Sequence, residues 1–201
     1  MSHREAVFGP SALLTPANLL TLGRLLASPV MIVLVVTTGP SSWLLCGLWF
    51  VCSYTDFLDG IVARRYGATR SGAFLDPLAD KFVVLGVLAA LAGIGEVNWL
   101  PVILIAVREV YMSVFRSYAG RRGVSVPARQ TAKLKTLLQD VVIGLIFLPP
   151  VGLHYTRVIG WLLWVVVAIT LWTGFEYLRD SRELLAGAHQ PPEGNVGGGT
   201  A

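Results

Sequence analysis

Four aspartates lie close together in a sequence that otherwise carries little charge. They are a third of its 12 acidic residues: Asp56, Asp59, Asp76 and Asp80. Carboxylates beside apolar sequence are costly to bury unless positive charge lies between them, and four of them would also repel one another. We therefore expect two divalent cations to balance them. Ligands that are all oxygen favour a hard ion, Mg²⁺ or Mn²⁺, over zinc.

The spacing of the aspartates predicts which of them share a surface. Asp56 and Asp59 are three residues apart, and Asp76 and Asp80 are four apart, so each pair would share one helix face. A short loop between the helices, expected over residues 67–72, would hold them antiparallel and let the two faces meet. Paired metal ions are a known arrangement for displacement at phosphorus.

Glycine and arginine residues near this loop indicate a phosphate ligand. Gly60 follows Asp59 within a helix, where glycine is costly, so its missing side chain would admit a ligand. Gly72 is expected to open the next helix, whose N-terminal amides favour phosphate. Arg64, one turn beyond Gly60, would suit a diphosphate. The alternative is that the aspartates only form ion pairs with nearby cations, namely Arg64, Arg65, Arg70 and Lys81.

The composition indicates the kind of protein that holds these residues. Of the 201 residues, 54% are hydrophobic and 14% charged, with a mean hydropathy of +0.65, whereas soluble domains carry about 25% charged residues. We therefore expect an all-α integral membrane protein. At about 20 residues a span, the chain has room for six transmembrane helices and no second domain. The net charge of +4 lies between apolar segments, which favours lipid head groups and phosphate substrates over nucleic acid.

The apolar runs and their breaks predict where the elements begin and end. Transmembrane helices are expected over about residues 18–36, 43–65, 72–92, 99–118 and 156–178, with another that follows a basic loop over residues 120–135 and ends near residue 148. Residues 1–16 would form a short juxtamembrane segment. The membrane domain would therefore cover residues 1–186, and the Gly- and Pro-rich tail over 187–201 would be disordered.

The basic residues predict an orientation. They gather on one side of the expected spans, and the other side receives only Arg157. The positive-inside rule places the charged side, with both termini, in the cytoplasm. The aspartates lie at this end of their helices, so the site is expected to open toward the cytosol.

The full motif reads Asp56-x2-Asp59-Gly60-x2-Ala63-Arg64, followed by Gly72-x3-Asp76-x3-Asp80. It resembles the signature of the CDP-alcohol phosphotransferase family. The similarity extends over most of the chain and is greatest to the bacterial phosphatidylglycerophosphate synthases within that family. It includes Asn18, Thr21, Arg24 and Pro29, then Arg108-Glu109 with Arg116, then Lys133, Lys135 and Thr136.

This resemblance implies six transmembrane helices, usually in a homodimer, and displacement of CMP from a CDP-linked donor by an alcohol. Asp56, Asp59 and Asp76 would be metal ligands, and Asp80 a metal ligand that also acts as general base. Room for the cytidine nucleotide would come from Gly60, Ala63 and Gly72, with Arg64 near its diphosphate. The wider similarity implies CDP-diacylglycerol as donor, glycerol 3-phosphate as acceptor, and the bacterial cytoplasmic membrane as location.

An anionic acceptor requires basic residues near the metal ions. The candidates are Arg70, Arg108, Arg116, Lys133 and Lys135. A charge in mid-span, such as that of Arg108, is by default a candidate for function. The alternatives are a structural ion pair of Arg108 with Asp140 or Glu176, and a lipid-anchoring role for Arg70, Lys133 and Lys135.

Other functions are compatible with parts of this pattern. Within the family they are a CMP-forming cardiolipin synthase and an inositol-phosphate transferase. A cation- or proton-coupled transporter could use the same acids, but the aspartates lie at one end of their spans and no inverted repeat is visible. A catalytically inactive relative is disfavoured because every motif residue is present.

Overall fold

The computed structural model describes residues 16–66, 70–121 and 130–187. Side chains are described over 19–55, 78–115, 117–118 and 135–179, and only the backbone over the remaining described residues. The expected juxtamembrane segment lies outside the described residues except for Pro16. So does the expected tail, except for Gly187.

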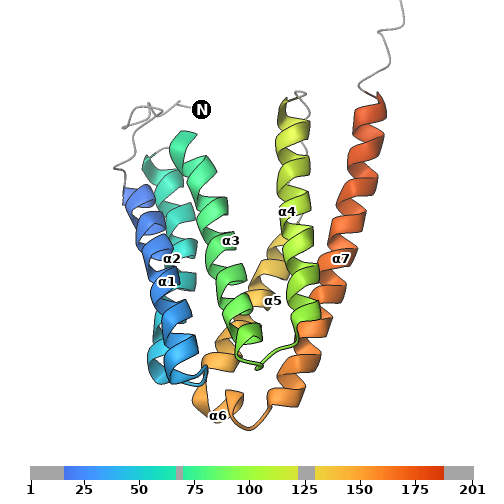
Figure 1. Cartoon of the computed structure of the whole chain (residues 1–201). Coiled ribbons are helices and arrows are strands. Elements are labelled where there is room, and N and C mark those ends of the chain that lie inside the picture. The colour runs from blue at the N-terminus through green and yellow to red at the C-terminus, as the bar shows by residue number, and fades with distance from the viewer. Residues whose placement is uncertain (1–15, 67–69, 122–129, 188–201) are drawn as a thin grey trace, which may run out of the picture.

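Six long helices and one short one form the described part of the chain (Figure 1). They are α1 (Pro16–Thr38), α2 (Trp43–Tyr66), α3 (Arg70–Gly93), α4 (Trp99–Arg121), α5 (Gln130–Phe147), α6 (Pro149–Gly152) and α7 (Thr156–Gly187). No strand occurs among these residues, so the all-α expectation is confirmed.

Several helix ends extend further into polar sequence than expected. α3 begins at Arg70 instead of Gly72, and α4 ends at Arg121 instead of Tyr118. α5 begins at Gln130, so Lys133 and Lys135 are helical and do not lie in a loop. α7 continues to Gly187, well beyond the expected end at Leu178. Hydropathy marks only the apolar part of a helix, while Arg, Glu, Gln and Lys continue it readily in polar surroundings.

Two of the long helices, α1 and α7, are long and apolar enough to cross a bilayer. α1 has 23 residues, about 34 Å at 1.5 Å a residue, against a hydrocarbon core of about 30 Å. By both length and hydropathy, two stretches of the described chain can cross a membrane, Leu19–Thr38 and Thr156–Arg179. A shorter apolar helical stretch covers Trp43–Thr55. The structure therefore confirms a helical chain with apolar spans, while the number of six spans stays a prediction.

The helices pack as two groups, which are joined by contacts of α5 and by the packing of α3 against α4. α1 packs against α2 and α3, while α7 packs against α4 and α5. Contacts from α5 to α2 and α3 connect the groups. The core between them is aliphatic and aromatic and takes residues from every long helix, among them Met31, Leu45, Trp49, Leu88, Leu91, Ile105, Ile143, Phe147 and Leu163.

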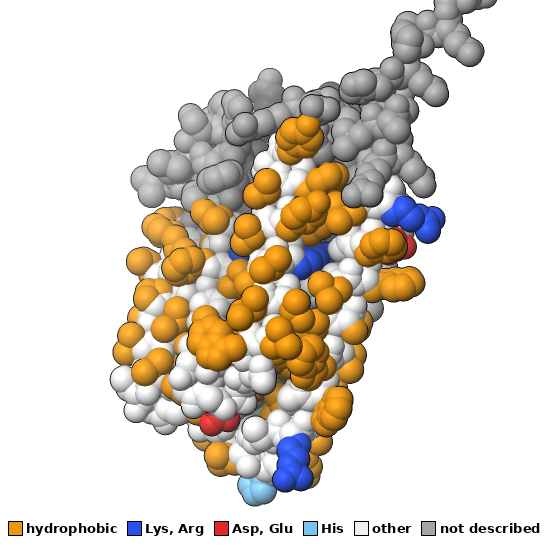
Figure 2. Space-filling model, turned by 45° about the vertical axis from the view of Figure 1, so that its right-hand side comes forward, with side chains coloured by type: hydrophobic (Ala, Val, Ile, Leu, Met, Phe, Trp, Pro, Cys, Tyr) orange, Lys and Arg blue, Asp and Glu red, His pale blue; other side chains and the backbone are white. Residues whose placement is uncertain are grey.

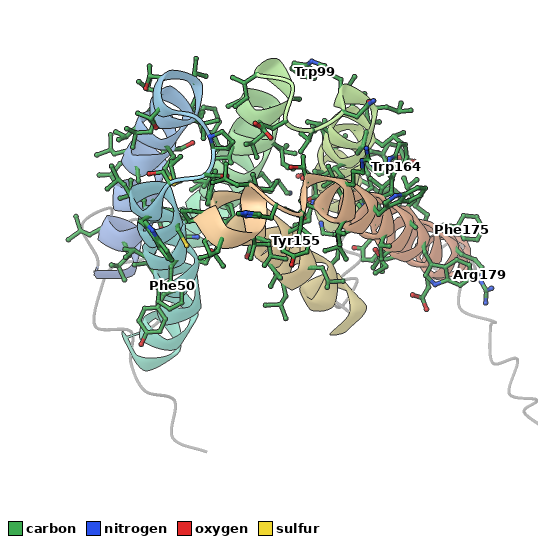
Figure 3. The ribbon with its side chains drawn as sticks, turned by 90° about the horizontal axis from the view of Figure 1, so that it is seen from below. Phe50, Trp99, Tyr155, Trp164, Phe175 and Arg179 are labelled. Atoms are coloured by element: carbon green, nitrogen blue, oxygen red, sulfur yellow. The ribbon has the colours of Figure 1, made fainter. Side chains whose placement is uncertain are left out.

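The outer surface of the bundle is also apolar. Figure 2 shows hydrophobic side chains over most of the described part of one face. Phe50, Trp99 and Phe175 point away from the bundle (Figure 3) and are more than half exposed. Water-soluble monomers rarely expose so much continuous apolar surface, so this surface is typical of a protein in contact with lipid.

The turns that the structure describes gather at one end of the bundle, and the C-terminal ends of α2, α4 and α7 lie at the other (Figure 1). Gly39 begins the α1–α2 turn with a φ of 85°, a conformation that glycine adopts without strain. The amide of Ser42 then donates to the carbonyl of Phe147 at 3.1 Å and ties this turn to the end of α5. The opposite end, the upper end in Figure 1, holds the C-terminal end of α2 and the N-terminal end of α3.

Candidate active site

The aspartate motif lies on two helices, α2, which ends at this upper end, and α3, which begins there. α2 carries the first half in its last turns, and α3 carries the second half in its first turns, together Asp56, Asp59, Gly60, Ala63, Arg64, Arg70, Gly72, Asp76 and Asp80. Gly72 is the third residue of α3, so it lies in the first turn and does not open the helix. Of the four aspartates, only Asp80 has a described side chain. The meeting of the two acidic faces therefore stays a prediction.

Asp80 borders two small cavities inside the bundle. The first, of about 10 Å³, is also lined by Arg24, Trp49, Cys52, Ser53, Val83, Val84 and Asp140. The second, of about 30 Å³, is also lined by Lys81, Val84, Leu85, Glu109, Lys135, Thr136 and Gln139. Ligand pockets typically measure about 300–1,000 Å³. Around Asp80 the described residues therefore leave room for water and not for a nucleotide.

Arg108 is bound to groups of the protein itself. Its Nε donates to the carbonyl of Thr170 at 3.1 Å, and its Nη2 to the Thr173 hydroxyl at 3.3 Å. Its Nη1 donates to Glu109 Oε1 at 2.9 Å. The partner is thus the neighbouring residue, and neither Asp140 nor Glu176, the ion-pair partners considered from the sequence, is involved.

Lys135 of α5 is a buried cation that lines the second cavity together with Asp80. Its side chain is 6% exposed, and its Nζ forms an ion pair with Glu109 Oε1. Lys81, which follows Asp80, donates from its Nζ to the hydroxyl of Ser113 on α4. That hydroxyl in turn donates to the carbonyl of Glu109 at 2.7 Å. The second cavity therefore has two lysines fixed on its wall.

The other basic candidates are placed by their helices alone. Arg70 is the first residue of α3, Lys133 lies in the first turn of α5, and Arg116 lies in the last two turns of α4. The N-terminal end of α3 and the C-terminal end of α4 lie at the upper end, which also carries the aspartates, whereas α5 begins lower, behind α4 (Figure 1). Their side chains lie outside the described residues, so their convergence on one ligand stays a prediction.

Glu109 was not expected to be a central residue of this region. The sequence does contain a signal for it, because Glu109 directly follows Arg108 in an apolar helix and two adjacent charges there require partners. What the sequence does not reveal is the partner on another helix, Lys135, which is 26 residues away.

The donor set of the motif fits a hard divalent cation. All four side chains are carboxylates, the ligands that Mg²⁺ and Mn²⁺ prefer. No group of three His, Cys, Asp or Glu side chains gathers within the described side chains, which include only one of the four aspartates. The fit therefore rests on the chemistry of the donors and on their spacing of three and four residues within α2 and α3.

Comparison with known protein families covers both the motif and most of the fold. The family model for CDP-alcohol phosphatidyltransferase matches residues 14–172, from before α1 to within α7. The chain belongs to this family. The resemblance read from the aspartate motif is thereby confirmed, and the chain is classed with the phosphatidyltransferases. Membership also agrees with the apolar helices, since the family consists of membrane-associated enzymes.

Relatives of this phosphatidyltransferase match it over nearly its full length. A probable phosphatidylglycerophosphate synthase of Mycobacterium tuberculosis is 36% identical over 190 residues, 92% of this chain and 90% of the relative. A CDP-diacylglycerol–glycerol-3-phosphate 3-phosphatidyltransferase of Rickettsia bellii is 36% identical, over 83% of this chain and 94% of its own. The protein of the same name from Salmonella choleraesuis is 33% identical, over 82% and 93%.

Proposed function

We propose that this phosphatidyltransferase transfers the phosphatidyl group of CDP-diacylglycerol to glycerol 3-phosphate, giving phosphatidylglycerophosphate and CMP. The observation that carries the proposal is near full-length similarity to proteins named for this reaction, at 32–36% identity. The complete aspartate motif on α2 and α3 supports it, because the reaction needs charge stabilisation at two phosphates.

The motif residues divide the binding of the donor between them. Asp56, Asp59 and Asp76 would hold two divalent cations, Mg²⁺ or Mn²⁺, with Asp80 as a further ligand. When bound, such ions neutralise the charge that develops on phosphate oxygens during displacement. Room for the cytidine nucleotide would come from small residues, and Arg64 would face the diphosphate; the small residues are Gly60, Ala63 and Gly72.

The chemical step is a direct displacement. The acceptor hydroxyl gives its proton to the Asp80 carboxylate, and its oxygen bonds to the phosphorus that bears the diacylglycerol. The bond from that phosphorus to the bridging oxygen breaks, and CMP leaves with the electron pair. A positioned carboxylate acting as base contributes about 10²–10⁴-fold. No histidine is assigned a role in this step. His154 is exposed at the far end of the bundle, and His3 and His189 lie outside the described residues.

The acceptor phosphate is assigned to cations around the second cavity. Lys135 is buried on its wall beside Asp80. Arg70, Arg116 and Lys133 would extend the basic surface toward the upper end. Arg108, also a candidate from the sequence, has three of its donors engaged within the protein, so we assign it a supporting role.

The setting of the enzyme is part of the proposal. Six helices long enough to cross or nearly cross a bilayer support six transmembrane spans in the bacterial cytoplasmic membrane. The distribution of basic residues supports a site that opens to the cytosol. A homodimer is proposed from the family resemblance alone, as are a membrane domain over residues 1–186 and a disordered tail over 187–201.

An acceptor panel tests this proposal. Purified protein in detergent is given CDP-diacylglycerol, Mg²⁺ and one acceptor, and both CMP release and the lipid product are measured. The acceptors are glycerol 3-phosphate, inositol phosphate, phosphatidylglycerol and serine. We expect CMP and phosphatidylglycerophosphate with glycerol 3-phosphate. Release of CMP only with phosphatidylglycerol or inositol phosphate would reassign the acceptor. If no acceptor gave CMP release, a transporter or an inactive relative would be supported.

A further inference from the structure

A cluster of three buried charges lies between α4, α5 and α7. Glu109 is 8% exposed and Lys135 5% exposed, and the Arg108 side chain is 10% exposed. One carboxylate oxygen, Glu109 Oε1, accepts hydrogen bonds from both cations. Buried charge is tolerated only when paired, and here two cations share one carboxylate, so this cluster of three carries an excess of one positive charge; Asp80 and Lys81 add one charge of each sign at the same cavity. Such an excess suits an anion.

The two cations of this cluster differ in how far they are engaged. Arg108 uses Nε, Nη1 and Nη2 on protein acceptors of α4 and α7. Gly174 of α7 provides the space for it, because a Cβ there would lie 3.2 Å from Arg108 Nε. Arg108 therefore fixes α4 to α7 and holds the Glu109 carboxylate in place.

Lys135 keeps hydrogen-bonding capacity. Its ammonium has three N–H donors, and Glu109 is its one partner among the residues that the structure describes. Lys135 also lines the second cavity together with Asp80. An oxyanion that approaches Asp80 from this cavity would meet the remaining Lys135 donors. The position of that ammonium depends on Glu109.

We propose that Glu109 is a positioning residue for the acceptor: it holds the Lys135 ammonium on the wall that Asp80 shares, and so sets the affinity for the acceptor's phosphate. This assignment rests on the proposed function, in which the acceptor is anionic. Glu109 does not touch substrate and acts through Lys135. The competing explanation is that the cluster only stabilises the packing of three helices.

A double-mutant cycle separates the two explanations. Glu109→Gln, Lys135→Gln and the double variant are compared with wild type for kcat, for KM of glycerol 3-phosphate and for KM of CDP-diacylglycerol. We expect each single variant to raise the KM of glycerol 3-phosphate about tenfold, the effect of losing one charged hydrogen bond. Because Glu109 acts through Lys135, the double variant should be no worse than Lys135→Gln alone. The KM of CDP-diacylglycerol should stay within about twofold in all three variants.

Controls and opposite outcomes define the test. Glu96→Gln, an exposed acid in the α3–α4 turn, should leave both KM values unchanged. Should Glu109→Gln not fold, Glu109→Asp keeps the charge but withdraws the carboxylate by one methylene, and it should raise only the KM of glycerol 3-phosphate. Multiplicative effects in the double variant, or equal rises in both KM values, would overturn the assignment, as would thermal destabilisation with unchanged KM. Failure of wild type to use glycerol 3-phosphate would instead refute the proposed function, and this inference with it.

Discussion

A residue of the apolar core can also form a hydrogen bond between helices. Trp49 illustrates this: its ring meets Phe147 edge-on with centroids 5.8 Å apart, while its Nε1 donates to the Asp140 carbonyl at 2.9 Å. One side chain thus joins α2 to α5 by packing and by a hydrogen bond, next to the first cavity.

Replacing Trp49 separates these two contributions. Trp49→Phe keeps most of the packing and loses the donor, so we expect a loss of about 0.5–1.5 kcal/mol. Trp49→Ala also leaves a cavity and should cost about 3–5 kcal/mol. Thermal unfolding in detergent, followed by circular dichroism, measures both. Trp43→Ala, at a position 68% exposed, is the matched control; a loss there as large as that of Trp49→Ala would contradict this account of the core.

Residue type and spacing predicted which helix ends carry the aspartates, but not which residues contact Arg108. The aspartates could be assigned to two helix ends because their spacing of three and four residues is itself helical. The partners of Arg108 could not, because Thr170 and Thr173 become its neighbours only through the packing of α4 on α7. A charge in a span signals that a partner exists and does not identify it.

Several elements meet closely at the end opposite the aspartates. There α6 turns the chain from α5 to α7, and Ser41 Oγ donates to the Ile146 carbonyl at 3.3 Å. Gly152 is buried in this corner, and a Cβ on it would overlap both the Ile146 carbonyl oxygen and the Ser41 hydroxyl. The close approach of α6 to α5 and to the α1–α2 turn therefore depends on a residue without a side chain.

Substitution of Gly152 tests this corner. Gly152→Ala should destabilise by about 1–3 kcal/mol, because a backbone oxygen cannot move aside as a side chain can. Gly160→Ala on α7 has no atom within 4 Å of the added carbon and should be neutral or slightly stabilising through helix propensity. Melting temperatures in the same detergent compare the two. Equal melting temperatures for the two variants would show that the corner tolerates the added methyl group.

Element boundaries were predictable where glycine or proline breaks the chain. The end of α1 before Gly39 and the end of α5 before Pro149 follow from such residues; a turn begins at Gly39, and the short helix α6 begins at Pro149. The polar C-terminal parts of α4 and α7 could not be predicted in this way, because a hydropathy pattern ends at the last apolar residue while the helix continues beyond it. The same limit placed Lys135 in a loop, although it is buried within α5.

For the whole molecule, the proposal requires the aspartate end to face the cytosol. The opposite end carries Arg157, and the aspartate end carries Arg179 in the last part of α7; both are exposed. The positive-inside rule assigns the two ends to opposite sides of the membrane.

Cysteine labelling measures this orientation. In a chain with Cys46 and Cys52 replaced by Ala, Arg157→Cys should react with a membrane-impermeant maleimide in intact cells. Arg179→Cys should react only after the cytoplasmic membrane is permeabilised. The reverse pattern would place the candidate site outside the cytosol, where CDP-diacylglycerol made inside the cell could not reach it as proposed.

Metal-dependent CMP release shows most directly whether the aspartates of α2 and α3 carry out the transfer to glycerol 3-phosphate. It is measured for wild type, Asp80→Asn and Glu96→Gln at matched thermal stability, with EDTA and then with Mg²⁺ or Mn²⁺ added. We predict no release in EDTA, recovery with either ion, wild-type rates for Glu96→Gln, and a loss of about 10²-fold or more for Asp80→Asn. Wild-type turnover by Asp80→Asn, or release that persists without metal, would contradict the account.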